Sequence, residues 1–214
     1  MPNTFRTALV CASNVNRSVE AHKYFLDHGF DSALVSSYGA ADIIRLPSST
    51  GKPLSAPFST NERSARKTTY QMLIDRCKDA AADFYAREGI IAMLERDITV
   101  KEAPESFQLT FRASRRAAFP QLVICFEEAV YVDLCRFMQV EMQTVDLIPV
   151  LVVNIETPDS IKSAGIGAEE AFRVASALGK IEPAEWIDKA DGVFRELNEE
   201  KESTKGMLHT FFFV

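Results

Sequence analysis

The chain has 214 residues, a net charge of −6, 47% hydrophobic residues and 25% charged residues. This is the composition of a globular protein, and the length allows a sizeable core without disulfides or a structural metal. The negative charge argues against broad, sequence-independent binding to nucleic acid, which needs a basic face. We therefore expect no direct nucleic-acid partner, although one local site can still bind a phosphorylated group.

Cysteine usage and hydropathy limit the protein class further. The four cysteines (Cys11, Cys77, Cys125 and Cys135) form no CxxC pair and no Cys/His group with zinc-ligand spacing. Residues 1–10 lack the apolar run of a signal peptide, and no apolar stretch approaches the ~20 residues that span a bilayer. We expect an intracellular protein with free thiols, no metal site and no membrane partner.

Apolar runs alternate with helical patterns along the chain. Buried strands are predicted at residues 7–11, 33–38, 122–126 and 150–154 because the runs are continuously apolar. Helices are predicted at 18–28, at 67–96 with a break near Gly89, from the third strand to about 142, at 169–178 and at 184–201. This order predicts one α/β domain over residues 1–214, with a doubly wound parallel sheet of about four to five strands flanked by helices. A proline- and serine-rich surface excursion is expected around residues 46–66.

The loop after the first strand is the candidate site. It reads Cys11-Ala12-Ser13-Asn14-Val15-Asn16-Arg17-Ser18. Ligands of such sheets bind beyond the carboxyl ends of the strands, where Cys11 lies. A thiolate can attack phosphorus, and the N-terminus of the following helix favours both a thiolate and a bound phosphate.

Each position in this loop has a chemical use. Backbone N–H groups of Ala12, Ser13, Asn14, Val15 and Asn16 can surround phosphate oxygens, and the two asparagines suit left-handed backbone positions. Arg17 can bind two oxygens bidentately, and the Ser18 hydroxyl can hydrogen-bond the Cys11 thiolate. The alternative is a buried cysteine with an unrelated arginine downstream. The position between a buried strand and a helix favours the catalytic interpretation of Cys11, Arg17 and Ser18.

The segment Val10–Lys23 resembles the RNA polymerase II C-terminal-domain phosphatase family of the mRNA cleavage and polyadenylation factor, a relative of the low-molecular-weight protein tyrosine phosphatases. Further similar segments follow in the same order: Ser37-Tyr38-Gly39 with Arg45-Leu46-Pro47, then Lys67-Thr68-Thr69-Tyr70, Gly89–Arg96, Val152–Glu156 and Leu208-His209-Thr210. The order of these segments makes the resemblance more specific than the loop alone.

The resemblance implies a low-molecular-weight tyrosine phosphatase-like fold and a cofactor-free phosphatase that forms a phosphocysteine intermediate. The implied substrate is phosphoserine followed by proline at the fifth heptad position of the RNA polymerase II C-terminal domain, with the Ser-Pro bond in cis. The implied partners are this phosphorylated domain and a symplekin-type scaffold, in the nucleus. Arg45, Leu46, Pro47 and Met93 match positions near the substrate groove; the alternatives are a solvated charge for Arg45 and a core residue for Met93.

A serine alkoxide is a poor leaving group, so this reaction needs a proton donor. Glu156 and Asp159 follow the fourth predicted strand, where a carboxylate would face the phosphate loop. By resemblance, the general acid matches Asp159, which we predict as the fourth catalytic residue. The alternative for Asp159 is a helix N-cap or a turn residue.

The chain departs from the family pattern in several places. The family's C-E-E-R is replaced here by Phe126–Ala129, and its K-P-N-V-Y by the different segment Lys52–Pro57. Extra residues relative to the family occur at about 60–66, 109–118 and 161–167. These differences bear on substrate preference and scaffold binding more than on the chemistry.

Two other functions compete with the phosphatase. One is an arsenate reductase-like enzyme, although the chain offers no cysteine pair near Cys77 to relay electrons. The other is a non-catalytic scaffold protein that binds phosphopeptides, against which the complete set of Cys11, Arg17, Ser18 and Asp159 argues. The closing segment Phe211–Val214 is expected to fold back onto the domain.

Overall fold

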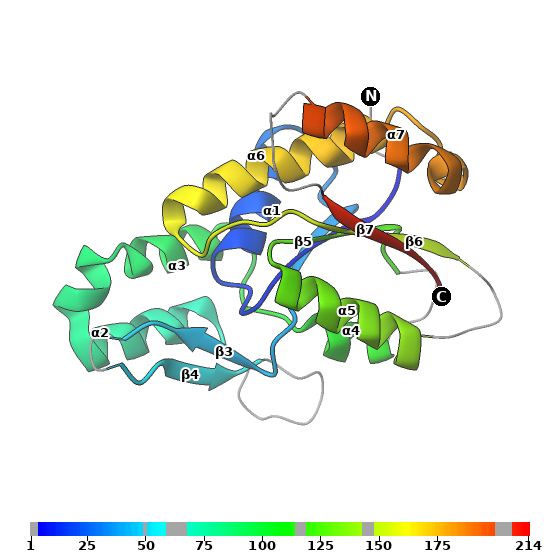
Figure 1. Cartoon of the computed structure of the whole chain (residues 1–214). Coiled ribbons are helices and arrows are strands. Elements are labelled where there is room, and N and C mark those ends of the chain that lie inside the picture. The colour runs from blue at the N-terminus through cyan, green and yellow to red at the C-terminus, as the bar shows by residue number, and fades with distance from the viewer. Residues whose placement is uncertain (1–3, 49–50, 59–67, 114–118, 143–147, 200–206) are drawn as a thin grey trace.

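The computed structural model describes residues 4–48, 51–58, 68–113, 119–142, 148–199 and 207–214 (Figure 1). Its central sheet has five strands in the order β2-β1-β5-β6-β7. Their bounds are β1 Thr7–Cys11, β2 Val35–Gly39, β5 Leu122–Cys125, β6 Pro149–Asn154 and β7 Leu208–Phe213. The four predicted strands are present and parallel, and every residue of β1 and β5 is buried, as a sheet covered on both faces requires.

The fifth strand makes the sheet mixed rather than wholly parallel. β7 runs antiparallel to β6, with Leu208 opposite Asn154 and Phe213 opposite Pro149. A parallel crossover has one helix between its two strands, but two helices lie between β6 and β7. The second helix returns the chain to the carboxyl end of β6, and β7 therefore runs antiparallel to it. The expectation that the C-terminal segment folds back onto the domain is confirmed, since Val214 is buried.

The segment predicted as a surface excursion contains a second, two-stranded sheet. β3 (Ile43–Leu46) pairs antiparallel with β4 (Leu54–Pro57). Ile44, Leu46 and Ala56 are buried in a hydrophobic cluster with the next two helices, which explains why this hairpin packs down instead of remaining a loop. Parts of the predicted excursion, helices and insertions fall outside the described part of the chain, at residues 49–50, 59–67, 114–118 and 200–201.

Seven α-helices occur in the described ranges. They are α1 Arg17–Asp27, α2 Tyr70–Arg87, α3 Ile90–Ile98, α4 Phe107–Ala113, α5 Glu128–Glu141, α6 Ile161–Leu178 and α7 Trp186–Glu199, the last preceded by a 3-10 turn at Pro183–Glu185. Gly89, at φ 72°, ends α2 as the sequence predicts. α6 begins well before the predicted residue 169, because the Ser160 side chain caps it by accepting from Ser163 N at 3.1 Å. α4 overlaps the first part of the predicted insertion at 109–118.

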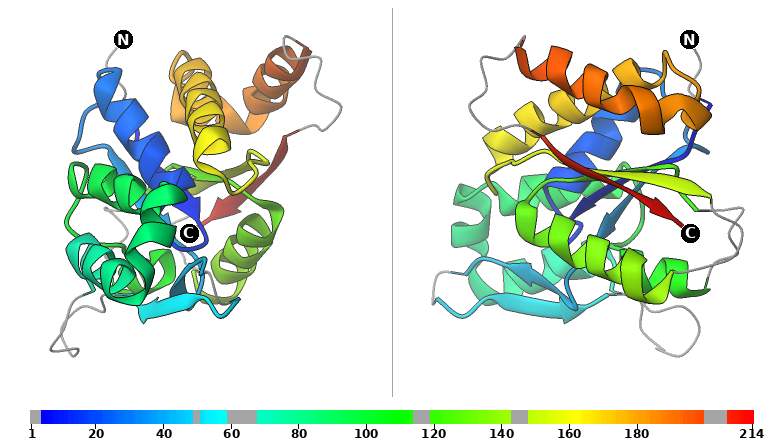
Figure 2. Two further views of the ribbon diagram at one scale, coloured as in Figure 1. Left: turned by 90° about the vertical axis from the view of Figure 1, so that its left-hand side faces the viewer. Right: turned by 45° about the vertical axis from the view of Figure 1, so that its right-hand side comes forward.

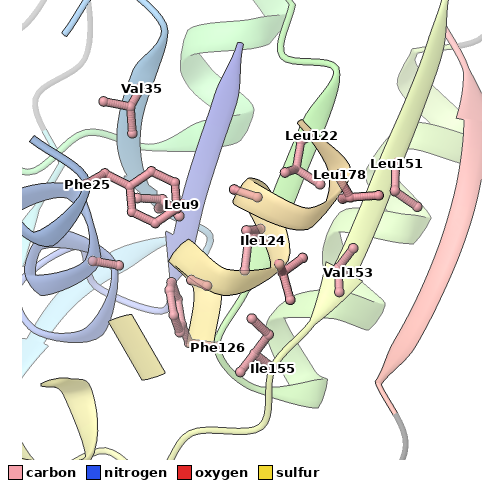
Figure 3. Close-up of a cluster of buried hydrophobic side chains, with 14 of the residues drawn as sticks. Leu9, Phe25, Val35, Leu122, Ile124, Phe126, Leu151, Val153, Ile155 and Leu178 are labelled. Carbon is pink, nitrogen blue, oxygen red and sulfur yellow. The ribbon is translucent and has the colours of Figure 1, made fainter. Parts of the chain in front are cut away.

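The helices form two layers and a lateral unit (Figures 1 and 2). α1, α6 and α7 cover one face of the sheet, where Phe25 and Leu178 pack on Leu9, Ile124 and Val153 (Figure 3). α4 and α5 cover the other face. α2 and α3 pack with the β3–β4 hairpin in a third cluster beside α1. No helix within the described ranges has the length and apolarity to cross a bilayer.

The cysteines outside the loop differ in burial. Cys125 is buried, as free cysteines usually are, and so is Cys77, whereas Cys135, for which we expected the same, is only partly buried. Burial raises the pKa of the Cys77 thiol to about 11. Cys77 is therefore protonated at neutral pH, in agreement with an inert structural thiol.

Candidate active site

The predicted phosphate loop connects the carboxyl end of β1 to the first turn of α1, because the buried strand ends at Cys11 and the helix begins at Arg17. The β2–β3 connection supports the start of the loop: Ala40 N donates to Cys11 O at 2.9 Å, and Ala41 N donates to Ala12 O at 3.0 Å. Cys11 is 3% exposed. Hydrogen bonds and burial thus hold the start of the loop in place, between the strand and the helix that the sequence predicts.

Asn14 and Ser18 give the Cys11 sulfur a defined hydrogen-bond donor. Asn14 has φ 53°, the left-handed conformation expected of an asparagine here. Its Oδ1 accepts from Glu105 N at 3.0 Å, which leaves Nδ2 to donate to Ser18 Oγ at 3.0 Å. Since Ser18 Oγ accepts this bond, the Ser18 hydrogen is free to point at Cys11 Sγ, 3.1 Å away. A donor in that position stabilises a thiolate, both as nucleophile and as leaving group.

Arg17 is held in place by the loops after β5 and β6. Its Nη1 donates to Phe126 O at 3.2 Å and Thr157 O at 3.0 Å, while Nη2 pairs with Glu127 Oε2 at 3.0 Å. Burial disfavours the guanidinium charge, but the thiolate of Cys11 and the carboxylates of Asp159 and Glu127 outweigh it and raise the pKa. Nε is buried and makes no hydrogen bond to a described residue, although Asp159 Oδ1 lies at ion-pair distance, 3.5 Å away, so its N–H can still be donated to an oxyanion.

Of the two candidate acids, only Asp159 faces the loop. Its Oδ1 accepts from Asn16 Nδ2 at 2.9 Å and lies 3.5 Å from Arg17 Nε, and its side chain is 65% exposed. Glu156 Oε2 instead accepts from Glu128 N at 3.0 Å, at the start of α5. The N-cap of α6 is Ser160, so the capping alternative does not describe Asp159.

The four predicted substrate-binding residues separate into two groups. Arg45 and Pro47 are exposed, and the backbone N of Arg45 donates to Ser13 Oγ at 3.1 Å, which places β3 beside the loop. Leu46 and Met93 are 1% and 7% exposed and belong to the cluster between the hairpin, α2 and α3. The core alternative therefore describes the packing of Met93, and Arg45 is the one of the four with a hydrogen bond to the loop.

Sequence reasoning assigned no role to several residues that support the loop. Glu127 pairs with Arg17, Glu105 orients Asn14, and Tyr70 Oη donates to Asn14 O at 2.7 Å. Gly39 has no room for a side chain, since a Cβ there would lie 2.8 Å from Ala12 O. These residues are distant from the loop in the chain and carry no spacing signal, although Tyr70 and Gly39 lie within segments that resemble the family.

His22 lies one helical turn after Ser18 and is buried. Its Nδ1 lies 3.2 Å from Ser37 Oγ. Burial and the nearby Lys101 charge lower its pKa to about 4, so His22 is neutral at pH 7. Among the described residues, no three His, Cys, Asp or Glu side chains are grouped as metal ligands.

An α/β sheet whose first strand leads through a cysteine-containing, phosphate-type loop into a helix defines an oxyanion-binding protein of the low-molecular-weight tyrosine phosphatase-like class. The chain belongs to the Ssu72-like protein family, whose model matches residues 5–214.

Similar proteins cover nearly the whole chain. The RNA polymerase II C-terminal domain phosphatase SSU72 of Dictyostelium discoideum is 32% identical over 211 residues, which are 97% of this chain and 89% of that protein. The protein of the same name from Danio rerio is 30% identical, covering 99% and 98%. The structure of Drosophila melanogaster Ssu72 with Symplekin, bound to a cis peptidomimetic phosphoserine peptide of the C-terminal domain, matches with a TM-score of 0.83 and 27% identity over 100% of both chains.

Proposed function

We propose that this chain is a cysteine-dependent protein-serine/threonine phosphatase of the CX5R type. We propose that it acts on phosphoserine-proline motifs of the RNA polymerase II C-terminal domain. The observation that carries the proposal is the Cys11–Ser18 loop, with Ser18 directed at the Cys11 sulfur and Arg17 and Asp159 converging on the same side. The relatives named as C-terminal domain phosphatases support the substrate.

In the first step, Cys11 Sγ attacks phosphorus, an S–P bond forms, and the bond from phosphorus to the serine oxygen breaks. Asp159 gives its proton to the departing oxygen, so the product leaves as neutral serine. Arg17 and the amides of residues 12–16 hold the phosphoryl oxygens and stabilise the charge of the transition state.

In the second step, the ionised Asp159 takes a proton from water as the water oxygen attacks phosphorus. The S–P bond breaks and inorganic phosphate leaves. The Cys11 thiolate recovers its hydrogen bond from the Ser18 hydroxyl, 3.1 Å away. The two steps regenerate thiolate and protonated acid without a cofactor.

The proposal extends to partners and organisation. The Drosophila relative was solved with Symplekin, which supports a symplekin-type scaffold as partner of this chain and a role in transcription and mRNA 3′-end processing in the nucleus. We propose one phosphatase domain over residues 1–214, since the family match spans residues 5–214. The exposed Arg45 and Pro47 are proposed to form the peptide-binding side, with Arg45 at its edge next to Ser13, and the buried Leu46 and Met93 are proposed to support it from the core below.

Phosphate release from heptad peptides tests this function. Peptides phosphorylated singly at each serine should be compared, with cis-locked and trans-locked versions of the best one. We expect hydrolysis of a phosphoserine-proline peptide and preference for the cis-locked form. Cys11→Ser should lose turnover but still bind the phosphopeptide, because only the nucleophile changes.

Three results would contradict the proposal. They are wild-type activity of Cys11→Ser, full loss of activity with EDTA, and arsenate reduction without phosphate release. Equal rates on cis-locked and trans-locked peptides would remove the cis requirement alone.

A further inference from the structure

A loop that binds phosphate through its amides must point its carbonyl groups the other way. The peptide unit is planar and trans, so the C=O of one residue and the N–H of the next point in opposite directions. Inward N–H groups at Val15 and Arg17 thus require outward carbonyls at Asn14 and Asn16. These carbonyls face the protein interior, since both asparagines are buried, and they need hydrogen-bond donors there.

Tyr70, in the first turn of α2, supplies the donor for the Asn14 carbonyl. Its side chain is 0% exposed, and Oη donates to Asn14 O at 2.7 Å. Burial and the nearby Asp97 carboxylate raise the Tyr70 pKa well above its ordinary value. The phenol therefore stays protonated and remains a donor, with Val15 N–H directed to the opposite side of that peptide plane.

Arg96, in the last turn of α3, supplies a donor for the Asn16 carbonyl. Its Nη2 lies 3.4 Å from Asn16 O, which also accepts the helical bond from Glu20 N at 2.9 Å. Two carboxylates fix the guanidinium: Nη1 pairs with Glu20 at 2.5 Å, and Nη2 pairs with the fully buried Asp97 at 2.5 Å. The longer bond from Arg96 makes it the weaker of the two supports.

We propose that Tyr70 and Arg96 are positioning residues that orient the Val15 and Arg17 amides toward the phosphate. Both side chains come from the α2–α3 unit, which packs beside α1 and off the faces of the main sheet (Figure 1). No described residue accepts a hydrogen bond from the amides of residues 12–17, which leaves these donors for an oxyanion. This inference rests on the proposed function for its effect on catalysis, but its effect on anion binding can be measured independently.

Tyr70→Phe is the principal test, because it removes the hydroxyl and keeps the ring in the core. The matched control is Tyr85→Phe, on the same helix and in the same cluster, where no hydrogen bond joins the hydroxyl to the loop. We expect Tyr70→Phe to lower kcat/KM about tenfold, the effect of losing one oriented hydrogen bond, mostly through kcat. Tyr85→Phe should stay within about twofold of the wild type on the same scale.

Alkylation of Cys11 by iodoacetamide gives a readout that needs no turnover. Inorganic phosphate should protect Cys11 in the wild type, and the concentration that halves the rate should rise several-fold in Tyr70→Phe. The pH midpoint of alkylation should also move upward, because misdirected amides stabilise the thiolate less. Neither change is expected of a side chain that only supports the fold.

Arg96→Lys keeps a cation beside Asp97 and provides a second test if Tyr70→Phe fails to fold. It should weaken phosphate protection relative to the wild type, and less than Tyr70→Phe does if that variant folds. Full activity and full protection in either folded variant would overturn the role of that residue. If the wild type hydrolyses no phosphate ester but Tyr70→Phe still weakens protection, the proposed function fails and the positioning role stands. A wild type without activity or protection would overturn both.

Discussion

Asp159 and Glu156 occupy the same loop after β6 but serve different partners. Asp159 contacts Asn16 and Arg17 at the phosphate loop, whereas Glu156 accepts from Glu128 N at the start of α5. Removing a positioned general acid usually costs ~10²–10⁴ in rate. We therefore expect Asp159→Asn to slow phosphoserine-peptide hydrolysis by that order, and Glu156→Gln to have a much smaller effect.

The leaving group sharpens this comparison. An aryl phosphate needs little protonation on departure, so Asp159→Asn should release its phenol nearly normally in single-turnover experiments. Steady-state rates alone would hide this, because phosphocysteine hydrolysis also uses Asp159 as a base. A crippled Glu156→Gln beside a nearly normal Asp159→Asn would assign the acid to Glu156 instead.

At the residue scale, the sequence predicts what is contiguous and misses what is brought together by folding. Cys11 to Ser18 is readable because a strand, a loop and a helix follow one another within a few residues. Tyr70 and Glu127 reach the loop from other elements, and no spacing rule connects them to Cys11. Position in the chain offered two candidate carboxylates and the resemblance selected Asp159; in the structure, Asp159 accepts a hydrogen bond from Asn16 of the loop, whereas Glu156 turns to α5.

At the element scale, β1, β5 and β6 were predictable because continuous apolar runs mark them. β2 departs from that pattern, because it contains two serines and its burial alternates along an edge strand. The β3–β4 hairpin was not predictable, because each strand has four residues and prolines and serines lie around it. The start of α6 was also missed: Gly165 and Gly167 lower helix propensity, yet Gly167 fits directly against Thr157. Local patterns cannot report such packing.

Gly39, at the end of β2, tests how closely the second strand fits the phosphate loop. A Cβ there would lie 2.8 Å from Ala12 O and 2.6 Å from the Phe58 ring. Since Ala12 belongs to the loop backbone, Gly39→Ala should both lower kcat/KM and reduce the free energy of unfolding by about 1–3 kcal/mol. Denaturant unfolding and peptide hydrolysis measure the two effects.

Gly165→Ala, in α6, is the matched control for Gly39→Ala. Nothing lies within 4 Å of its added Cβ. The exchange should stabilise the helix by up to about 1 kcal/mol and leave kcat/KM unchanged. Equal behaviour of the two variants would show that the loop tolerates a shift at Ala12.

At the scale of the whole molecule, the strand order separates the site from the far edge of the sheet. β1 carries Cys11 and is the second strand, whereas β7 is the last, three strand spacings or about 14 Å away. β7 nevertheless secures both layers, because Phe211 packs on the cluster under α1, α6 and α7 and Phe212 packs on the cluster under α5. Substitutions in β7 should therefore change the free energy of unfolding without changing kcat/KM.

Phe211→Ala tests this separation. Phe211 is opposite Leu151 in the sheet and partly buried, so its truncation should cost about 1–3 kcal/mol of unfolding free energy, less than a fully buried phenylalanine. Phe213→Ala, where the side chain is 47% exposed, should cost within about 0.5 kcal/mol. Well below the melting temperature, both variants should keep wild-type kcat/KM, because no loop residue changes its support. A fall in kcat/KM for Phe211→Ala with unchanged stability would instead show that the far edge of the sheet is coupled to the loop carrying Asp159.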